Sequence, residues 1–117
     1  GLGKTVTTAM IVKKLLFDLK GEVLVVAPPS IQKEWKETFR RFEIGSFRHY
    51  DVVTIGKLEK IRDTQRYELI IIDESHKFKN YATGRYKELE RICKERVKYK
   101  KKVILISATP LNNKPMD

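Results

Sequence analysis

The chain has 117 residues and a mass of 13.7 kDa, which fits one compact domain with one core. Apolar residues make up 41% and charged residues 34%, a balance that excludes a disordered or fibrous chain. No apolar run approaches the roughly 18 to 20 residues that a membrane span needs, and the N-terminus lacks the regions of a signal peptide. The single Cys93 excludes a disulfide within the chain. We therefore expect an intracellular protein with no membrane partner.

The charge is strongly positive and unevenly distributed. Lys and Arg number 25 against 15 Asp and Glu, giving a formal net charge of +10. Residues 77–102 alone hold 11 basic and 3 acidic side chains. Such a segment is compatible with a nucleic-acid partner, because phosphate contacts release counterions and supply affinity independent of sequence. A solvated helix face explains the same composition equally well.

The chain opens with Gly1-Leu2-Gly3-Lys4-Thr5, directly before a strongly helical segment. Glycines allow backbone N–H groups to approach phosphate oxygens, and a helix N-terminus adds the positive end of its dipole. In such a loop Lys4 reaches the β- and γ-phosphates, and the Thr5 hydroxyl can ligate Mg²⁺. The string alone is a weak indication of a phosphate-binding loop, because no strand precedes it here.

The next elements are a helix over Thr5–Lys20, a strand over Glu22–Ala27 and a second helix that has Ser30 as its N-cap. The second helix carries apolar residues at every fourth position, namely Ile31, Trp35 and Phe39. This spacing favours packing in the core over stacking of Trp35 on a nucleic-acid base.

In the second half, short runs rich in Val, Ile and Leu predict strands over Asp51–Ile55, Leu69–Asp73 and Val103–Ser107. Helical periodicity predicts a short helix around Lys57–Arg62 and a longer one over about Arg85–Lys100. Alternating helices and buried strands require parallel strands with right-handed crossovers. The fold class is therefore α/β, with helices on both faces of a parallel sheet.

Two acidic residues, Asp73 and Glu74, follow the apolar run Leu69-Ile70-Ile71-Ile72. Ligands bind at the carboxyl edge of open α/β sheets, where these acids would lie. An Asp there can hold Mg²⁺, and the adjacent Glu can deprotonate the water that attacks a γ-phosphate. A polar strand end that caps a helix is the alternative. The upstream Gly-Lys-Thr string favours the catalytic interpretation.

These strings resemble known motifs when they are taken in order. Gly-Leu-Gly-Lys-Thr, Asp-Glu-Ser-His and Ser107-Ala108-Thr109-Pro110 resemble motifs I, II and III of superfamily 2 helicases. The run Val25 to Ser30 followed by Trp35 resembles motif Ia of Swi/Snf-type ATPases, and Asp73 to Asn80 resembles their extended motif II. The resemblance covers residues 1–117. It implies a partial N-terminal RecA-like (P-loop NTPase) lobe, a three-layer α/β/α sandwich that lacks its N-terminal strand.

The resemblance also implies ATP and Mg²⁺ as cofactors and assigns roles to the motif residues. Gly1, Gly3, Lys4 and Thr5 would bind the phosphates, with Lys4 also catalytic. Thr5 and Asp73 would bind Mg²⁺, and Glu74 would be the general base.

The resemblance implies that the remaining motif residues couple the nucleotide state to the nucleic acid or contact the nucleic acid. His76, Ser107 and Thr109 would link nucleotide state to the nucleic acid, although a lone His can also be a polar residue satisfied at a helix start. The residues implied to contact nucleic acid are Pro28, Ser30, Thr54, Lys79 and Asn80.

The family works with two RecA-like lobes, and the second lobe is absent from this sequence. Its arginine fingers are worth roughly 10³ to 10⁵ in rate, so the isolated chain is expected to lack turnover. Family topology places the strands in the order Val103, Leu69, Glu22 and Asp51, naming each by its first residue, with the Val103–Ser107 strand as an open edge.

The leading hypothesis is the ATP-binding lobe of a Swi/Snf-type DNA-dependent ATPase that moves along duplex DNA. Its parent would be cytoplasmic in a prokaryote or phage and nuclear in a eukaryote. A strand-separating DExH helicase acting on DNA or RNA would share every catalytic residue. A basic nucleic-acid-binding module without turnover is the hypothesis from another class.

Overall fold

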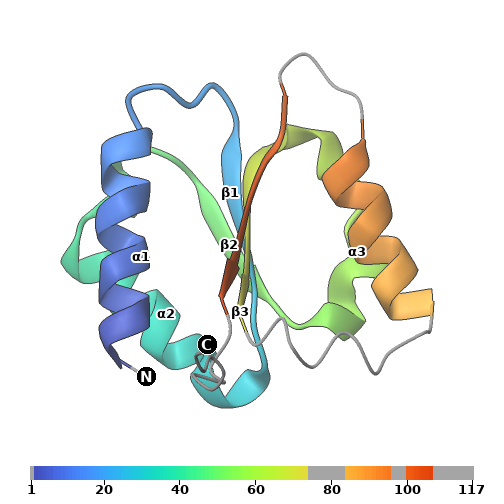
Figure 1. Cartoon of the computed structure of the whole chain (residues 1–117), viewed down its shortest axis with the longest axis horizontal. Helices are drawn as coiled ribbons and strands as arrows, with labels where there is room; N and C mark the ends of the chain where they lie inside the picture. Colours follow the sequence, from blue (N-terminus) through green and yellow to red (C-terminus); the bar gives the residue numbers. More distant parts are fainter. Residues whose placement is uncertain (1, 74–83, 96–99, 107–117) are drawn as a thin grey trace, which may run out of the picture.

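The computed structural model of the chain describes residues 2–73, 84–95 and 100–106. Its strands form one parallel, four-stranded sheet in the order β2-β1-β3-β4 (Figure 1). The strands are β1 (Glu22–Val26), β2 (Tyr50–Val53), β3 (Tyr67–Asp73) and β4 (Lys102–Ile106). Both the parallel pairing and the predicted strand order are confirmed.

Helices cover both faces of this sheet. One layer contains α1 (Leu2–Leu15) and α2 (Pro29–Arg41), and the other contains α3 (Gly84–Lys94) (Figure 1). Short 3₁₀ helices occupy the connections, namely η1 (Ile44–Ser46), η2 (Ile55–Lys60) and η3 (Thr64–Arg66). This three-layer α/β/α arrangement confirms the RecA-like fold class.

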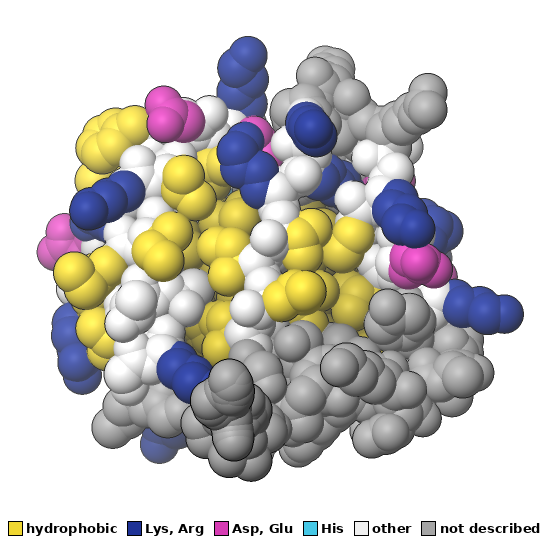
Figure 2. All heavy atoms as spheres, in the orientation of Figure 1, with side chains coloured by type: hydrophobic (Ala, Val, Ile, Leu, Met, Phe, Trp, Pro, Cys, Tyr) yellow, Lys and Arg dark blue, Asp and Glu magenta, His cyan; other side chains and the backbone are white. Residues whose placement is uncertain are grey.

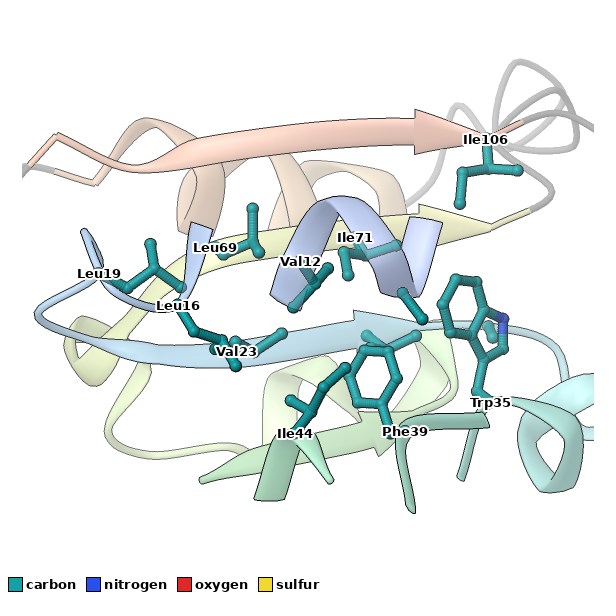
Figure 3. Packing of buried hydrophobic residues seen from close by; sticks show 13 residues of the cluster. Val12, Leu16, Leu19, Val23, Trp35, Phe39, Ile44, Leu69, Ile71 and Ile106 are labelled. Atoms are coloured by element: carbon teal, nitrogen blue, oxygen red, sulfur yellow. The ribbon is translucent and has the colours of Figure 1, made fainter. Parts of the chain in front are cut away.

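The strands separate two hydrophobic cores, because successive side chains point to opposite faces. On the α1 and α2 side, Val23, Val25, Leu69 and Ile71 pack with helix residues such as Val12, Leu16 and Phe39 (Figure 3). On the α3 side, Leu24, Val26, Ile70 and Ile72 pack with Leu58, Leu89 and Ile92. Every residue of β3 is buried. A register slip by one residue would exchange the two sets, so the fit of these side chains against the helices on each face must select the pairing.

The start of α2 differs from the prediction that Ser30 is its N-cap. The N-cap is Pro28, which is extended (φ −61°, ψ 155°) and makes no side-chain capping bond, and the helix begins at Pro29. A proline fits the first helical position because its missing N–H would have no intrahelical partner there. The Pro-Pro pair therefore starts the helix earlier than the serine signal indicated.

Three other helix predictions were too long or of the wrong type. Helix α1 ends at Leu15 rather than near Lys20, and α3 ends at Lys94, with residues 96–99 outside the described part. The segment around residues 57–62 forms the 3₁₀ helix η2, with i to i+3 bonds such as Lys57 N–H to the Thr54 carbonyl. Short segments of this kind gain too few bonds to nucleate a regular α-helix.

Strand β4 lies at the edge of the described sheet, as predicted. Its residues Val103 and Leu105 are 41% and 65% exposed, unlike those of the fully buried β3. Figure 2 shows apolar side chains gathered at the centre of this face, between the layers that contain α1 and α3. The sandwich is thus closed by helices on its two faces and open along β4 in the described part of the chain.

Glu68 fastens the turn between α1 and β1 from inside the sheet. Its carboxylate is buried and accepts the backbone N–H groups of Lys20 and Gly21 at 2.6 and 2.8 Å, with the Lys102 ammonium at 3.3 Å. Burial opposes the charge, but these donors outweigh it and hold the pKa of Glu68 below its usual range. By binding these amides, the carboxylate also favours the turn over a longer α1.

Replacement Glu68→Gln should therefore weaken the chain and flatten the pH dependence of its stability. The lowered folded pKa means that the unfolded chain binds the proton more tightly, so the stabilisation is full above about pH 5 and is lost as the pH falls further. At neutral pH the variant should lose about 1–3 kcal/mol of unfolding free energy. Urea titrations between pH 7 and 3 measure both effects. An equally steep acid dependence in the variant would contradict this role.

Candidate nucleotide and metal site

The first turn of α1 carries the predicted phosphate-binding residues Gly3, Lys4 and Thr5. Backbone N–H groups in this turn lack intrahelical acceptors and lie at the positive end of the helix dipole. A Cβ added at Gly3 would meet nothing within 4 Å, so open space lies beside the backbone there. Thr5 is only 3% exposed. The turn therefore offers backbone donors next to free volume, which suits a phosphate group.

Asp73 ends β3 and lies 8% exposed at the carboxyl edge of the sheet. Its Oδ2 atom accepts a 2.8 Å hydrogen bond from Nε1–H of Trp35 on α2, a contact buried on both sides. Trp35 is fully buried and meets Phe39 edge to face, with ring centroids 5.7 Å apart. Figure 3 shows its indole beside the carboxyl end of the sheet, near Ile106. The predicted core role of Trp35 is confirmed, and the indole N–H adds a polar contact.

The residue before Trp35 reaches the other predicted metal ligand. The Thr5 hydroxyl donates a 2.7 Å hydrogen bond to Oε2 of Glu34. Glu34 and Trp35 are adjacent in α2, so Thr5 and Asp73, 68 positions apart in the sequence, meet one turn of the same helix. Hydrogen bonds thus link both sequence-predicted metal ligands to adjacent residues of α2.

The donors gathered here fit Mg²⁺. Thr5 supplies a hydroxyl oxygen, and Asp73 and Glu34 supply carboxylate oxygens. Oxygen donors of this kind are the ligands that Mg²⁺ prefers, together with phosphate oxygens and water. With the donors of the α1 N-terminus, the residues fit a Mg²⁺-bound triphosphate.

The described nucleic-acid candidates lie together at the same sheet edge. The Ala27 N–H bonds the Val53 carbonyl at 2.9 Å, which places the ends of β1 and β2 side by side. Pro28 and Thr54 follow these ends and are half-buried, and Ser30 is exposed in the first turn of α2. Pro28, Ser30 and Thr54 therefore flank one region of surface.

The other predicted site residues lie outside the described part of the chain. These residues are Gly1, Glu74, His76, Lys79, Asn80, Ser107 and Thr109. Their roles stay predictions.

Sequence reasoning missed Glu34 and the polar contact of Trp35. A signal for Trp35 existed, because a buried indole N–H needs an acceptor, and Asp73 was a predicted buried acid. Nothing in the sequence distinguished Glu34 from Glu37, three positions further along the same helix.

A second group of possible metal ligands lies at the opposite, amino edge of the sheet. Oxygen and nitrogen atoms of Glu22, His49 and Asp51 come within 4.8 Å of one another. Arg66 bonds Glu22 at 2.9 Å and Asp51 at 3.2 Å. Burial opposes ionisation of Asp51, but the Tyr67 hydroxyl and the neighbouring His49 and Arg66 lower its pKa. One guanidinium thus already pairs with both carboxylates and offsets one of their two negative charges.

The described basic residues near the C-terminus are largely engaged within the chain. Arg91 pairs with Glu88, and Lys94 pairs with Glu90 at 3.1 Å. The Lys101 side chain, 2% exposed, bonds Glu95 at 2.9 Å, and Lys102 reaches Glu68. For the part of residues 77–102 that the structure describes, these pairs favour an internally neutralised face over a nucleic-acid surface.

No helix among the described residues is long and apolar enough to cross a membrane.

The comparisons with known proteins agree with the motifs. The profile of a family described as DEAD/DEAH box helicase matches residues 1–117. The chain is 30% identical to an uncharacterized ATP-dependent helicase, YqhH, of Bacillus subtilis, over 97% of the chain and 22% of that protein. It is 31% identical to a SWI/SNF-related matrix-associated actin-dependent regulator of chromatin, subfamily A-like protein 1, of Xenopus tropicalis, over 100% of the chain and 14% of that protein.

A more distant relative is the helicase SWR1 of Mycosarcoma maydis, 26% identical over 100% of the chain and 8% of that protein. The chain thus spans less than a quarter of the length of these relatives. The resemblance to Swi/Snf-type members of superfamily 2 is confirmed.

The contact between Trp35 and Asp73 makes a spectroscopic prediction. The chain contains one tryptophan, so its indole N–H should give one resonance, shifted downfield and slow to exchange because it donates to a buried carboxylate. Replacement Asp73→Ala should move this resonance upfield and speed its exchange in ¹H–¹⁵N spectra. Glu37→Ala, an exposed change on the same helix, should leave it in place. An unmoved resonance in Asp73→Ala would show that the bond is absent in solution.

Proposed function

Because the chain belongs to the DEAD/DEAH box helicase family, we propose that it is the ATP-binding motor lobe of a SWI/SNF-type, DNA-dependent ATPase. In the full-length protein this lobe couples ATP hydrolysis to movement along duplex DNA. The observation that carries the proposal is the convergence of Thr5 and Asp73 on adjacent residues of α2, beside the N-terminus of α1. This arrangement supports phosphate binding and metal binding at one place.

The residues of motifs I and II share the binding of Mg²⁺·ATP and the chemistry on it. Backbone N–H groups from Gly3 onward face the phosphates, and Lys4 supplies a positive charge to the β- and γ-phosphates, with Gly1 completing the loop. Thr5 and Asp73 hold Mg²⁺, which neutralises phosphate charge when bound. Glu74 directly follows Asp73 at the end of β3 and acts as general base on the attacking water.

The remaining motif residues connect this site to the nucleic acid. Pro28, Ser30 and Thr54 contact the DNA backbone through main-chain and hydroxyl groups, because they flank one surface at the same edge. Lys79 and Asn80 extend this contact. His76 with Ser107 and Thr109 transmits nucleotide state, and a second RecA-like lobe supplies the arginine fingers.

The location of the full-length protein is intracellular in this proposal. The similarity to a bacterial helicase and to a regulator of chromatin supports the cytoplasm of a prokaryote or the nucleus of a eukaryote.

The proposal predicts that the full-length protein hydrolyses ATP and that duplex DNA stimulates this hydrolysis. Hydrolysis is measured with duplex DNA, single-stranded DNA and RNA added separately, and Glu74→Gln should abolish the stimulated rate while ATP binding persists. Stimulation by single strands or RNA alone would instead support a strand-separating DExH helicase. Absence of hydrolysis under all conditions would leave a nucleic-acid-binding module.

Replacement Gly3→Ala should lower the affinity for ATP without lowering the stability of the fold. The added methyl group meets no protein atom within 4 Å, and Ala favours helix over Gly by up to about 1 kcal/mol, so stability should hold or rise. The methyl group would occupy space next to the donors proposed for phosphate, so ATP affinity should fall. Thermal unfolding and binding of a fluorescent ATP analogue measure the two effects.

The matched control is Thr7→Ala, which changes helix propensity at an exposed position of α1 further from the N-terminus. Its ATP affinity should equal that of the wild type. Full ATP affinity in Gly3→Ala would count against the proposed phosphate position.

A further inference from the structure

The adjacent residues Glu34 and Trp35 on α2 contact the two proposed metal ligands, and no motif assigned either of them to the nucleotide site. Glu34 accepts from Thr5 at 2.7 Å, and Trp35 donates to Asp73 at 2.8 Å. We propose that Glu34 and Trp35 are positioning residues for Mg²⁺, orienting Thr5 and Asp73 from one turn of α2. This inference rests on the proposed function, because it deepens the Mg²⁺·ATP site.

The contact to Glu34 restricts what the Thr5 hydroxyl can do. A threonine hydroxyl has one proton to donate and two lone pairs. The proton is directed to Oε2 of Glu34, so only lone pairs remain for any other partner. Thr5 is thereby prepared to act as a ligand to a cation rather than as a donor. The carboxylate of Glu34 also adds a negative charge close to that position, which favours a divalent cation electrostatically.

The contact to Trp35 fixes Asp73 in a complementary way. An indole N–H is a donor only, so it can bind the carboxylate oxygen but cannot compete with it for a cation. It engages Oδ2 of Asp73 and leaves the other oxygen for a metal or its waters. Because the indole is fully buried and packed against Phe39, the donor is held in one direction. The carboxylate is therefore oriented before a metal arrives.

Such partners of metal ligands usually matter for affinity. Removing the groups that orient ligands typically costs about 10- to 100-fold in metal affinity. Both contacts come from one helix, whose packing against the sheet is part of the first core. The orientation of the ligands thus depends on the placement of α2.

The test uses the full-length protein and a non-hydrolysable, fluorescent ATP analogue as probe. Its affinity is measured with Mg²⁺ and with EDTA, and the ratio of the two affinities gives the gain due to the metal. Trp35→Phe keeps an aromatic ring but lacks the N–H, and Glu34→Gln keeps an acceptor but lacks the charge. Each should reduce the metal-dependent gain by roughly 10-fold and leave the affinity in EDTA near that of the wild type.

Two control variants test whether packing or general charge explains the result. Ile92→Val disturbs the second core, on the face of the sheet away from Trp35, and it should lower the melting temperature but keep the full metal-dependent gain. Glu37→Gln removes an exposed charge from the same helix and should keep the gain as well.

The outcomes separate the inference from the function on which it rests. An unchanged metal-dependent gain in Trp35→Phe and Glu34→Gln would overturn the inference, as would equal losses with Mg²⁺ and EDTA. A reduced gain in Ile92→Val would also overturn it, because a general loss of stability would then explain the effect. If the wild type itself showed no gain from Mg²⁺, the proposed nucleotide site would fail before the variants were considered.

Discussion

The parallel pairing of β1 and β3, buried on both faces, is the constraint on which the rest of the structure depends. Parallel neighbours need crossover connections, so the chain must pass over the sheet in helices between strands. The crossovers here use both faces and create two cores. The same constraint sends every strand in one direction, so all carboxyl ends lie at one edge. A residue that ends a strand and a residue at the start of a packed helix can then reach the same neighbouring helix, as Asp73 and Thr5 both reach α2.

Helix α2 connects the core to the site. Its buried face serves packing, since Trp35 and Phe39 lie at 0% exposure in the first core. A buried indole N–H without an acceptor would cost about 1–3 kcal/mol, and Asp73 supplies the acceptor from the end of β3. The demand of the core for a satisfied donor and the demand of the site for an oriented carboxylate are therefore met by one hydrogen bond. A change of packing under α2 would reach the site through this bond.

The sequence allowed the class of fold to be predicted, because short apolar runs such as Leu69–Ile72 between helical segments favour a buried parallel sheet. The order of the strands was predicted from the family resemblance. The ends of the helices were harder to predict. The start of α2 depended on the Pro28-Pro29 pair, and the turn that follows α1 is held by Glu68, 48 positions from the Lys20 amide that it binds. Local signals contain no information about such a distant acceptor.

For the candidate site too, some features could be inferred from the sequence and others only from the structure. Gly3, Thr5 and Asp73 could be proposed from the sequence because phosphate and Mg²⁺ chemistry calls for those residue types at a helix start and a strand end. The partners of Thr5 and Asp73 could not, since their selection depends on which turn of α2 faces the sheet edge. Trp35 was assigned to the core from its spacing, and that assignment is confirmed. Spacing gives the buried face of a helix but not the polar atom that a buried side chain meets.

The ion pairs change the interpretation of the positive charge near the C-terminus. Arg91, Lys94, Lys101 and Lys102 belong to the most basic stretch of sequence, yet each has a carboxylate partner within the chain. For these four described residues, composition alone therefore overstates the charge that is left for a polyanion. Exposed basic residues of α2 and η2 lie instead on the two elements that begin beside Pro28 and Thr54; they include Lys33, Lys36, Lys57 and Lys60. Because these elements start at the same sheet edge as the proposed nucleotide site, a phosphate backbone attracted to them would lie next to α2, the helix that orients both metal ligands.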